Sequence, residues 1–382
     1  MSIDLILVGV SLFTWGIGES MFFFFQPIYL EQLGATPLLI GTIFSLFGLV
    51  MLFTHIPAGY LADRIGRRPL MIAAWLAGVI ATCVMALARS LPLFVVGMLF
   101  YGLTAFVSSP LFSYVTAARG RMSAGRAMTL TSAMYNLGAV IGPITGGLIG
   151  EQMTLRTVYW VAAGIFIVSS VLLFFIRPQS RDHHDINSPP TGLLSNRGYL
   201  SFLGISFLAV FSMYLSQTLT PNFLLNERGV SLIWLGRLGS IGCLGNALLN
   251  LAFGQLNARL GFILSQVSVG LFAGLLWQGG GLFWYGLGYF LLGGYRSARM
   301  LAFAQVRSLI HQSQMGLAYG FAETVNSLAI ILAPLLAGYL YEGNPVVIYP
   351  VSLGFLLISI LVSVFLSPRE ASRRVSTTSS TS

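Results

Sequence analysis

The sequence predicts an all-α integral membrane protein with twelve transmembrane helices in two pseudo-symmetric six-helix bundles. Composition, a series of apolar runs and an internal repeat predict this fold. Hydrophobic residues make up 56% of the 382 residues, charged residues only 8%, and the mean hydropathy is +0.83. Soluble domains carry about 25% charged residues. A chain this apolar cannot cover itself with polar surface, so we expect a lipid bilayer around it.

Twelve apolar runs are long enough to cross a bilayer, for which a helix needs about 20 residues. The first six runs are residues 5–30, 38–61, 69–88, 91–117, 127–150 and 157–176. The second six are residues 199–224, 232–257, 262–280, 282–307, 315–341 and 346–366. Only three glycines, at 279–281, separate the ninth run from the tenth, and they suit a tight turn.

The runs divide the chain into two bundles and two polar segments. We expect an N-terminal bundle at 1–176 and a C-terminal bundle at 199–368. Between them, residues 177–198 are rich in charge, Pro, Ser and Asn, which is typical of a solvated linker, here a cytoplasmic one. The polar tail at 369–382 should be disordered and cytoplasmic.

The basic residues are all arginines, and most lie in short breaks between apolar runs. With a cytoplasmic N-terminus, fourteen arginines fall in the cytoplasmic connections and tail, four outside, and two inside a span. Basic residues favour cytoplasmic loops. We therefore expect a multi-pass protein of the cell membrane, plasma or inner, with both termini cytoplasmic. The net charge of +9 reflects this topology, and we expect no nucleic-acid partner.

The two halves carry an internal repeat at an offset of 195 residues. The pattern G-x-L-x-x-R-x-G occurs at residues 59–66 and again at residues 254–261, without a gap. Gly34 and Gly229 are among the other residues that this offset pairs. The shared pattern at the end of the second span of each half predicts that the halves have the same topology.

GYLADRIGRRPL, at residues 59–70, resembles the signature of the loop between the second and third helices in the major facilitator superfamily. In that family, an acidic and several basic residues form a cytoplasmic charge cluster that latches one conformation, and small residues let the helix end and the loop turn. The resemblance, with the second-half copy, assigns this gating loop to Gly59, Asp63, Arg64, Gly66, Arg67, Arg68 and Arg259. The second copy has Ala258 in place of the acidic residue, so its latch is incomplete. Alternatively, the arginines only orient the protein in the membrane.

The fifth span contains GAVIGPITGG, which resembles the motif associated in this superfamily with antiporters, especially drug/proton antiporters. Small residues let another helix approach closely, and proline bends a helix, so the segment predicts a pivot for rocking. Its residues are Gly138, Gly142, Pro143, Gly146 and Gly147. The eleventh span carries a relic of it at Ala333, Pro334 and Gly338. The alternative is ordinary packing of small residues.

Two departures from the family bear on proton coupling. The fourth span lacks the arginine that many proton-coupled members carry there, and the first span lacks the acidic motif that many multidrug members show. The antiporter-like segment favours efflux, whereas the missing arginine leaves other modes of transport open.

Four ionisable residues lie inside predicted spans, where a charge costs at least about 2.5 kcal/mol on insertion scales. They are Glu19 in the first span, Arg296 and Arg299 in the tenth, and Glu323 in the eleventh. Arg299 and Glu323 are each roughly 12 Å from the inner end of their spans, at 1.5 Å per residue, so an ion pair is expected. We expect Glu19 to bind a proton or a cationic substrate; alternatively, it is a structural carboxylate. The arginine pair either recognises an anionic group or compensates charge.

Spans 1, 4, 7 and 10 line the central cavity in the superfamily, so the resemblance places Glu19 and both arginines of the tenth span near the substrate path. Trp15 and Tyr101 lie on two of these spans. Ligand sites commonly combine aromatic walls with a few polar groups, so these two residues are candidates for the floor of a pocket for an amphipathic molecule.

The sequence thus predicts a secondary active transporter of small organic molecules that works by alternating access, with proton-linked efflux preferred. The alternatives are a symporter or uniporter for an organic anion or sugar, and a non-transporting membrane sensor with the same fold. The chain has no lysine and therefore no phosphate-binding P-loop, and it has neither H-E-x-x-H nor G-x-S-x-G. We expect no enzymatic activity, cofactor or metal, and a monomer whose partners are the bilayer, a small-molecule substrate and, in the proton-linked mode, H+.

Overall fold

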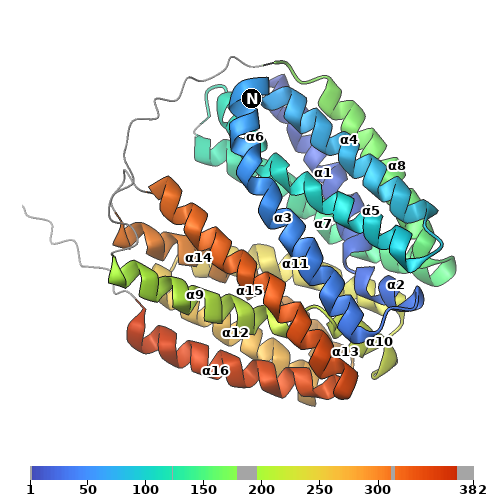
Figure 1. Cartoon of the computed structure of the whole chain (residues 1–382), viewed down its shortest axis with the longest axis vertical. Coiled ribbons are helices and arrows are strands. Elements are labelled where there is room, and N and C mark those ends of the chain that lie inside the picture. Colours follow the sequence, from blue (N-terminus) through green and yellow to red (C-terminus); the bar gives the residue numbers. More distant parts are fainter. Residues whose placement is uncertain (1, 123, 179–195, 311–314, 368–382) are drawn as a thin grey trace, which may run out of the picture.

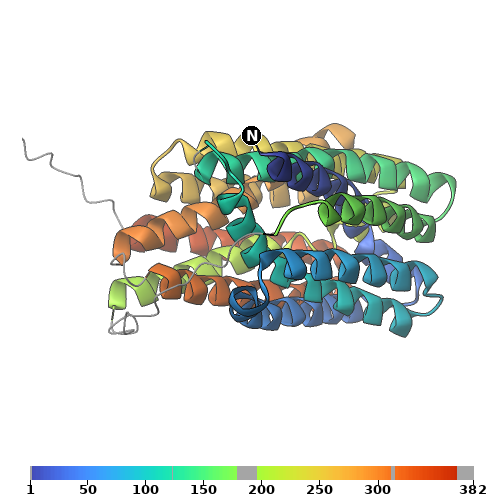
Figure 2. The ribbon, with the colours of Figure 1, turned by 90° about the horizontal axis from the view of Figure 1, so that it is seen from above.

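The computed structural model describes residues 2–122, 124–178, 196–310 and 315–367. Most of the predicted linker and the whole predicted tail therefore lie outside the described residues. Every regular element in the described ranges is a helix. Figures 1 and 2 show these helices running side by side, from upper left to lower right in the view of Figure 1.

The first half contains eight α-helices and one short 3₁₀ helix within the described ranges. Their bounds are α1 (Ile3–Phe23), α2 (Gln26–Gln32), α3 (Pro37–Ile65), α4 (Arg67–Leu87), α5 (Leu91–Leu103), η1 (Thr104–Val107), α6 (Ser108–Ala117), α7 (Ala124–Gln152) and α8 (Leu155–Phe174). The second half contains α9 (Arg197–Leu215), α10 (Thr220–Asn226), α11 (Leu232–Gly254), α12 (Ala258–Gln278), α13 (Leu282–Leu292), α14 (Gly294–Leu309), α15 (Met315–Gly343), η4 (Pro345–Val347) and α16 (Ile348–Leu366).

All twelve predicted runs are helical, but the first, fourth, seventh and tenth are interrupted. The first divides into α1 and α2 and the seventh into α9 and α10, and Pro27 and Pro221 lie in the first turn of the second piece. Proline has no N–H to donate to the preceding turn, so a helix tends to restart there. The fourth passes through η1, and the tenth breaks at Gly293. The continuous spans predicted at these four places were therefore wrong in detail.

Eleven described helical stretches are long and apolar enough to cross a membrane. The tenth predicted span is the one that is not among them. Its break leaves α13 with 11 residues and α14 with 16. The second of these pieces carries three arginines, which lower its hydropathy. The two pieces together still cover the predicted run, so the fold retains the twelve predicted crossings.

The repeat is visible in the backbone. Gly34 follows α2 and Gly229 follows α10, and both have a positive φ, of 93° and 63°. Glycine adopts this conformation without the strain that a Cβ would bring. The two positions that the 195-residue offset pairs therefore form equivalent turns.

Two groups of buried polar side chains, one in each half, are hydrogen-bonded among themselves, which suits an apolar surrounding. In the first half, the Trp75 indole donates to the hydroxyls of Ser11 at 3.0 Å and Ser169 at 2.9 Å. In the second half, Gln266 accepts from the Ser359 hydroxyl at 2.7 Å and donates to Ser363 at 3.0 Å.

Helix α7 packs against α1 through three glycines spaced four residues apart. A Cβ on Gly138 would overlap the carbonyl oxygen of Phe13, and a Cβ on Gly146 would overlap that of Met21. Gly142 meets the Ser20 hydroxyl in the same way. Residues spaced by four lie on one helix face, so the antiporter-like segment brings these two backbones into contact.

We predict that Gly138→Ala lowers the midpoint of thermal unfolding in detergent, because overpacking a close contact costs roughly 1–3 kcal/mol. The matched control is Gly164→Ala on α8, where a Cβ would meet no described atom within 4 Å. Alanine is the better helix former, so the control should keep or raise the midpoint. Equal midpoints for the two variants would contradict the packing described above.

Candidate functional site

A cavity of about 1180 Å³ lies between the two halves. Its walls come from α1, α3, α4, the α5–η1–α6 span, α7, α14 and α15. Five of the predicted site residues line it and contribute to its aromatic wall and its charges, namely Trp15, Glu19, Tyr101, Arg299 and Glu323. Other lining residues are Phe23, Trp75, Thr131, Ser132 and Tyr135. The cavity is thus a mainly apolar chamber with a small set of polar groups.

The aromatic wall is built around Trp15. Its ring stacks on Phe166 with centroids 3.9 Å apart and planes within 7°, and it lies 4.9 Å from the ring of Trp75. Tyr101 continues the stack at 6.4 Å from Trp15. The Tyr101 hydroxyl is buried and has no hydrogen-bond partner among the described residues. The prediction that Trp15 and Tyr101 lie on the cavity is correct, and the wall also includes Trp75.

Glu19 is half-buried on α1 and faces α7 across the cavity wall. The Tyr135 hydroxyl donates a hydrogen bond of 2.7 Å to its Oε2 atom. This bond stabilises the ionised carboxylate, while the aromatic rings beside it supply an apolar surrounding. Glu19 therefore presents a charge-bearing acceptor to anything that enters the cavity.

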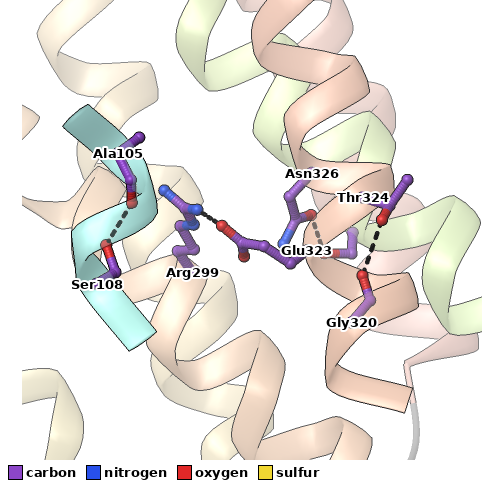
Figure 3. A network of polar contacts seen from close by, with 8 residues as sticks. Ala105, Ser108, Arg299, Gly320, Glu323, Thr324 and Asn326 are labelled. Atoms are coloured by element: carbon purple, nitrogen blue, oxygen red, sulfur yellow. Dashed lines mark hydrogen bonds and ion pairs between the residues drawn. The ribbon is translucent and has the colours of Figure 1, made fainter. Parts of the chain in front are cut away.

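Arg299 on α14 and Glu323 on α15 form an ion pair at the second-half wall. This is the pair that their equal depth predicts. Figure 3 shows Arg299 extending toward the segment of Ala105 and Ser108 in the first half, with Glu323 on its other side. The Oε2 atom of Glu323 is buried without a hydrogen-bond partner in the described part of the chain. The pair offers the cavity nearly balanced charges instead of a net one.

Arg296 differs from Arg299, although they are one turn apart. Its side chain is exposed, and no carboxylate of the described residues pairs with it. It lies close enough to Tyr135 and Cys243 to interact electrostatically with both. Arg296 is outside the set of residues that line the cavity. It lies within electrostatic range of Tyr135, the residue that donates to Glu19.

The family model described as Major Facilitator Superfamily matches residues 8–304. The chain belongs to this superfamily. The uncharacterized MFS-type transporter MJ1560 of Methanocaldococcus jannaschii is 22% identical over 289 residues, which are 70% of this chain and 72% of that protein. The multidrug resistance protein MdtG of Citrobacter koseri is 30% identical over 180 residues, 46% of this chain and only 44% of that relative. A crystal structure of the nucleoside transporter NupG has a TM-score of 0.84 at 14% identity and covers 96% of this chain and 100% of its own, which shows a common fold.

The halves of this transporter meet along two seams, which the repeat relates to each other. In one seam, a Cβ on Gly236 of α11 would overlap the Pro143 carbonyl oxygen of α7, and the Ser240 hydroxyl donates to the Val140 carbonyl at 2.6 Å. Gly147 packs against α11 in the same seam. The antiporter-like segment therefore contacts the other half with one face and α1 with another.

The second seam repeats the first between α15 and α3. A Cβ on Gly41 would overlap the Pro334 carbonyl oxygen, and the Ser45 hydroxyl donates to the Ile331 carbonyl at 2.5 Å. Gly338 packs on Pro37 and its neighbour. The supposed relic in the eleventh span thus makes the same contact as the complete segment, with proline and glycine in equivalent positions.

The gating loop of the transporter is described only in part. Gly59, Asp63 and Arg64 lie in α3, and their side chains are outside the described part of the structure, so the predicted charge cluster stays a prediction. Helix α3 continues to Ile65, four residues beyond the predicted end of the apolar run at residue 61. Gly66, with φ of 97°, makes the turn into α4.

Arg67 and Arg68 begin α4 and have different surroundings. Arg67 lines a surface pocket with Arg119. Arg68 donates a hydrogen bond of 2.9 Å to the Phe174 carbonyl at the end of α8. A cation at a helix C-terminus is favourable, so Arg68 caps the last span of the first half.

Arg259 is equivalent to Arg68 in space, and not to Arg64 as the gapless repeat implied. It is the second residue of α12, as Arg68 is of α4, and it donates to the Val364 carbonyl near the end of α16. The second half is four residues shorter at this point, because α11 ends at Gly254, six residues before the equivalent of the end of α3, whereas its connection to α12 is two residues longer than that between α3 and α4. The predicted equivalence of Arg259 and Arg64 under the repeat was therefore wrong.

Sequence reasoning missed Tyr135 and Trp75. Both lie within apolar runs, where a tyrosine or tryptophan usually packs or faces lipid, and their spans were not expected to line the cavity. A signal for Tyr135 was available, because it lies three residues before Gly138 and hence beside the face of α7 that contacts α1.

We predict that Arg299→Ala and Glu323→Ala each lower the thermal unfolding midpoint more than the double variant does, because a single change leaves an unpaired charge. Contacting residues couple by about 0.5–3 kcal/mol, and the low end applies here since the two side chains are 30% and 33% exposed. A double-mutant cycle of unfolding midpoints tests this; additive effects would show that the pair contributes no coupling energy.

Proposed function

We propose that this transporter is a secondary active exporter of small organic molecules that works by alternating access and is linked to proton movement. The observation that carries the proposal is the Glu19 carboxylate, held by Tyr135 in an aromatic-walled cavity between the halves. A carboxylate that a proton and a cationic substrate bind in turn would couple their movements. The match to a multidrug resistance protein over part of the chain supports efflux of amphipathic compounds.

The two seams support alternating access. Both involve small residues and backbone carbonyls, so helix backbones of the two halves lie close to each other. Such contacts allow two rigid bundles to rock about a site near the middle of the bilayer. In the proposal, the bundles are residues 1–176 and 199–368, the connection is residues 177–198, and a monomer is sufficient.

The proposal places both termini in the cytoplasm of a cell membrane, in bacteria the inner membrane, because the arginines favour that orientation. The seams and the contact of α2 with α10 lie at the end opposite to the termini (Figure 1). The conformation described here would then be open toward the cytoplasm. Asp63, with the basic residues that follow it, would latch the opposite conformation.

We predict that Glu19→Gln abolishes export driven by a pH gradient, because the amide neither binds a proton reversibly nor attracts a cation. Flux of cationic dyes in proteoliposomes under an imposed pH gradient measures this. Glutamine has nearly the same shape as glutamate, so Glu19→Gln should keep the midpoint of thermal unfolding near that of the parent protein. An unchanged midpoint separates loss of coupling from loss of folding.

Glu342→Gln is the matched control for this experiment. It removes an exposed carboxylate at the end of α15, away from the cavity, and should leave dye export unchanged. Gradient-driven export by Glu19→Gln at the parent rate would contradict the assignment of Glu19. If the folded protein moves neither dyes nor anions, the sensor alternative is favoured.

One observation favours a second candidate, a symporter or uniporter for an organic anion or sugar. Arg296 is exposed and is not neutralised by any carboxylate in the described ranges. A guanidinium of this kind binds carboxylate or phosphate groups with two parallel hydrogen bonds.

Under this second candidate, we predict that Arg296→Gln lowers uptake of organic anions at least tenfold and leaves cationic dyes unaffected. Loss of a charged hydrogen-bond partner supports a change of that order. Competition between anions and dyes in the same proteoliposomes measures the preference. An unchanged anion flux in Arg296→Gln would exclude Arg296 as an anion site.

A further inference from the structure

The end of the molecule opposite to the termini, called the closed end here, is joined across the halves by Glu31. In Figure 1, α2 and α10 lie side by side at this end. The Oε1 atom of Glu31 accepts a hydrogen bond of 2.8 Å from the Asn226 amide, and Oε2 accepts from the Asn222 amide. The Asn222 amide also donates to the Pro27 carbonyl at 3.2 Å, which fixes its orientation. Both oxygens of one carboxylate of the first half are thus bound to donors of the second half.

A second carboxylate of the first half makes the same kind of contact. Glu151, at the end of α7, accepts a hydrogen bond of 2.8 Å from the Leu232 N–H at the start of α11. The N-terminus of a long helix carries partial positive charge, so an ionised carboxylate is favourable there. This bond extends the seam between α7 and α11 to the surface.

Neither carboxylate is compensated by a cation. Among the residues that the structure describes, no arginine forms an ion pair with Glu31 or Glu151. Three of the four arginines at this end are bound elsewhere: Arg156 donates to the Ala86 and Leu87 carbonyls, Arg228 donates to the Trp277 carbonyl and covers Phe223, and Arg237 stacks on Trp234. The fourth, Arg89, forms no ion pair with a carboxylate in the described ranges. The titratable groups near Glu31 on the neighbouring helices are Tyr341 of α15 and Glu227 at the end of α10. Tyr341 lies within electrostatic range of both carboxylates. Uncharged donors alone therefore hold these two negative charges.

The repeat shows that this arrangement exists on one half only. Glu31 and Asn226 are equivalent under the 195-residue offset, so an acceptor on one half faces a donor at the same position of the other. Glu342 is equivalent to Glu151 under the 191-residue offset of the seams, but the residue equivalent to Leu232 is Pro37, which has no N–H. No hydrogen bond from Glu342 to the other half is found in the described structure.

We propose that Glu31 and Glu151 are proton-binding sites that hold the closed end shut when they are ionised and release it when they are protonated. A protonated carboxyl group loses its charge, which weakens both hydrogen bonds, and a proton on Oε2 would also face the Asn222 N–H as donor against donor. The Pro27 carbonyl prevents the Asn222 amide from turning to accept instead. Asn222 is only 1% exposed, so water cannot replace the lost acceptor without opening the contact.

The inference rests on the proposed alternating access, but the experiment that tests it does not depend on transport. It assigns to Glu31 and Glu151 control over which end is open, whereas Glu19 is assigned to coupling with substrate. A distance measurement across the closed end needs no substrate and no gradient. The distance measurement can therefore contradict this inference while the Glu19 experiment supports the proposed function. The opposite combination of results is also possible.

The experiment measures distances between two spin labels at the closed end by pulsed electron paramagnetic resonance in lipid nanodiscs. The labels are placed on the exposed positions Ser90 and Gln278, as Ser90→Cys and Gln278→Cys, in a background with Cys83→Ala and Cys243→Ala. Distances are recorded from pH 8 to pH 4.5 for the parent protein, for Glu31→Gln with Glu151→Gln, and for Glu342→Gln. The last variant carries the same chemical change at the mirror position, where no contact is lost.

In the parent protein, the ratio of long to short distances should rise roughly tenfold as the pH falls, which is the scale expected for loss of a charged hydrogen bond. The double variant should show the long distances already at pH 8 and respond little to pH, while Glu342→Gln should follow the parent. A double variant that stays closed at pH 8 would overturn the proposal. So would a Glu342→Gln protein that opens as the double variant does, because the effect would then be general to charge at this end.

Discussion

The close approach of helix backbones at glycines is the constraint on which the rest of this structure depends. In lipid there is no hydrophobic force that drives one helix against another, so association relies on packing and on hydrogen bonds between helices. Here glycines on α7 bring it against both α1 and α11, and Gly41 and Gly338 do the same for α3 and α15. Larger residues would separate these backbones, and the cavity that they enclose would lose its walls.

The position of the cavity follows from the breaks in four helices. The interrupted spans are the first, fourth, seventh and tenth, and three of them supply residues to the cavity. An interrupted helix leaves backbone groups and polar side chains to be satisfied at mid-depth, which is tolerated where they face protein or water and not lipid. Glu19 and Arg299, two of the charged residues of the site, lie on these spans.

Much of the fold could be predicted from the sequence, because apolar runs of bilayer length leave few alternatives. The ion pair of Arg299 and Glu323 was also predictable, since depth along a helix follows from residue number. The helix breaks were not, because Pro27 and Pro221 follow apolar residues that would continue a helix in another context. The place of Arg259 was missed because a matching pattern of glycine and arginine concealed a shorter helix before it. The partners of Glu19 and Glu31 depend on which helix faces which, and spacing along one helix does not contain that information.

The two seams are equal in their proline, glycine and serine contacts but differ at their outer ends, where Pro37 takes the place of Leu232. One side of the molecule therefore has a backbone donor to bind a carboxylate, and the other has none. The two seams therefore differ in strength, and we expect them to separate at different times. The α3–α15 side should separate before the α7–α11 side, so the halves would move apart as a wedge that first exposes one flank of the transporter to the lipid.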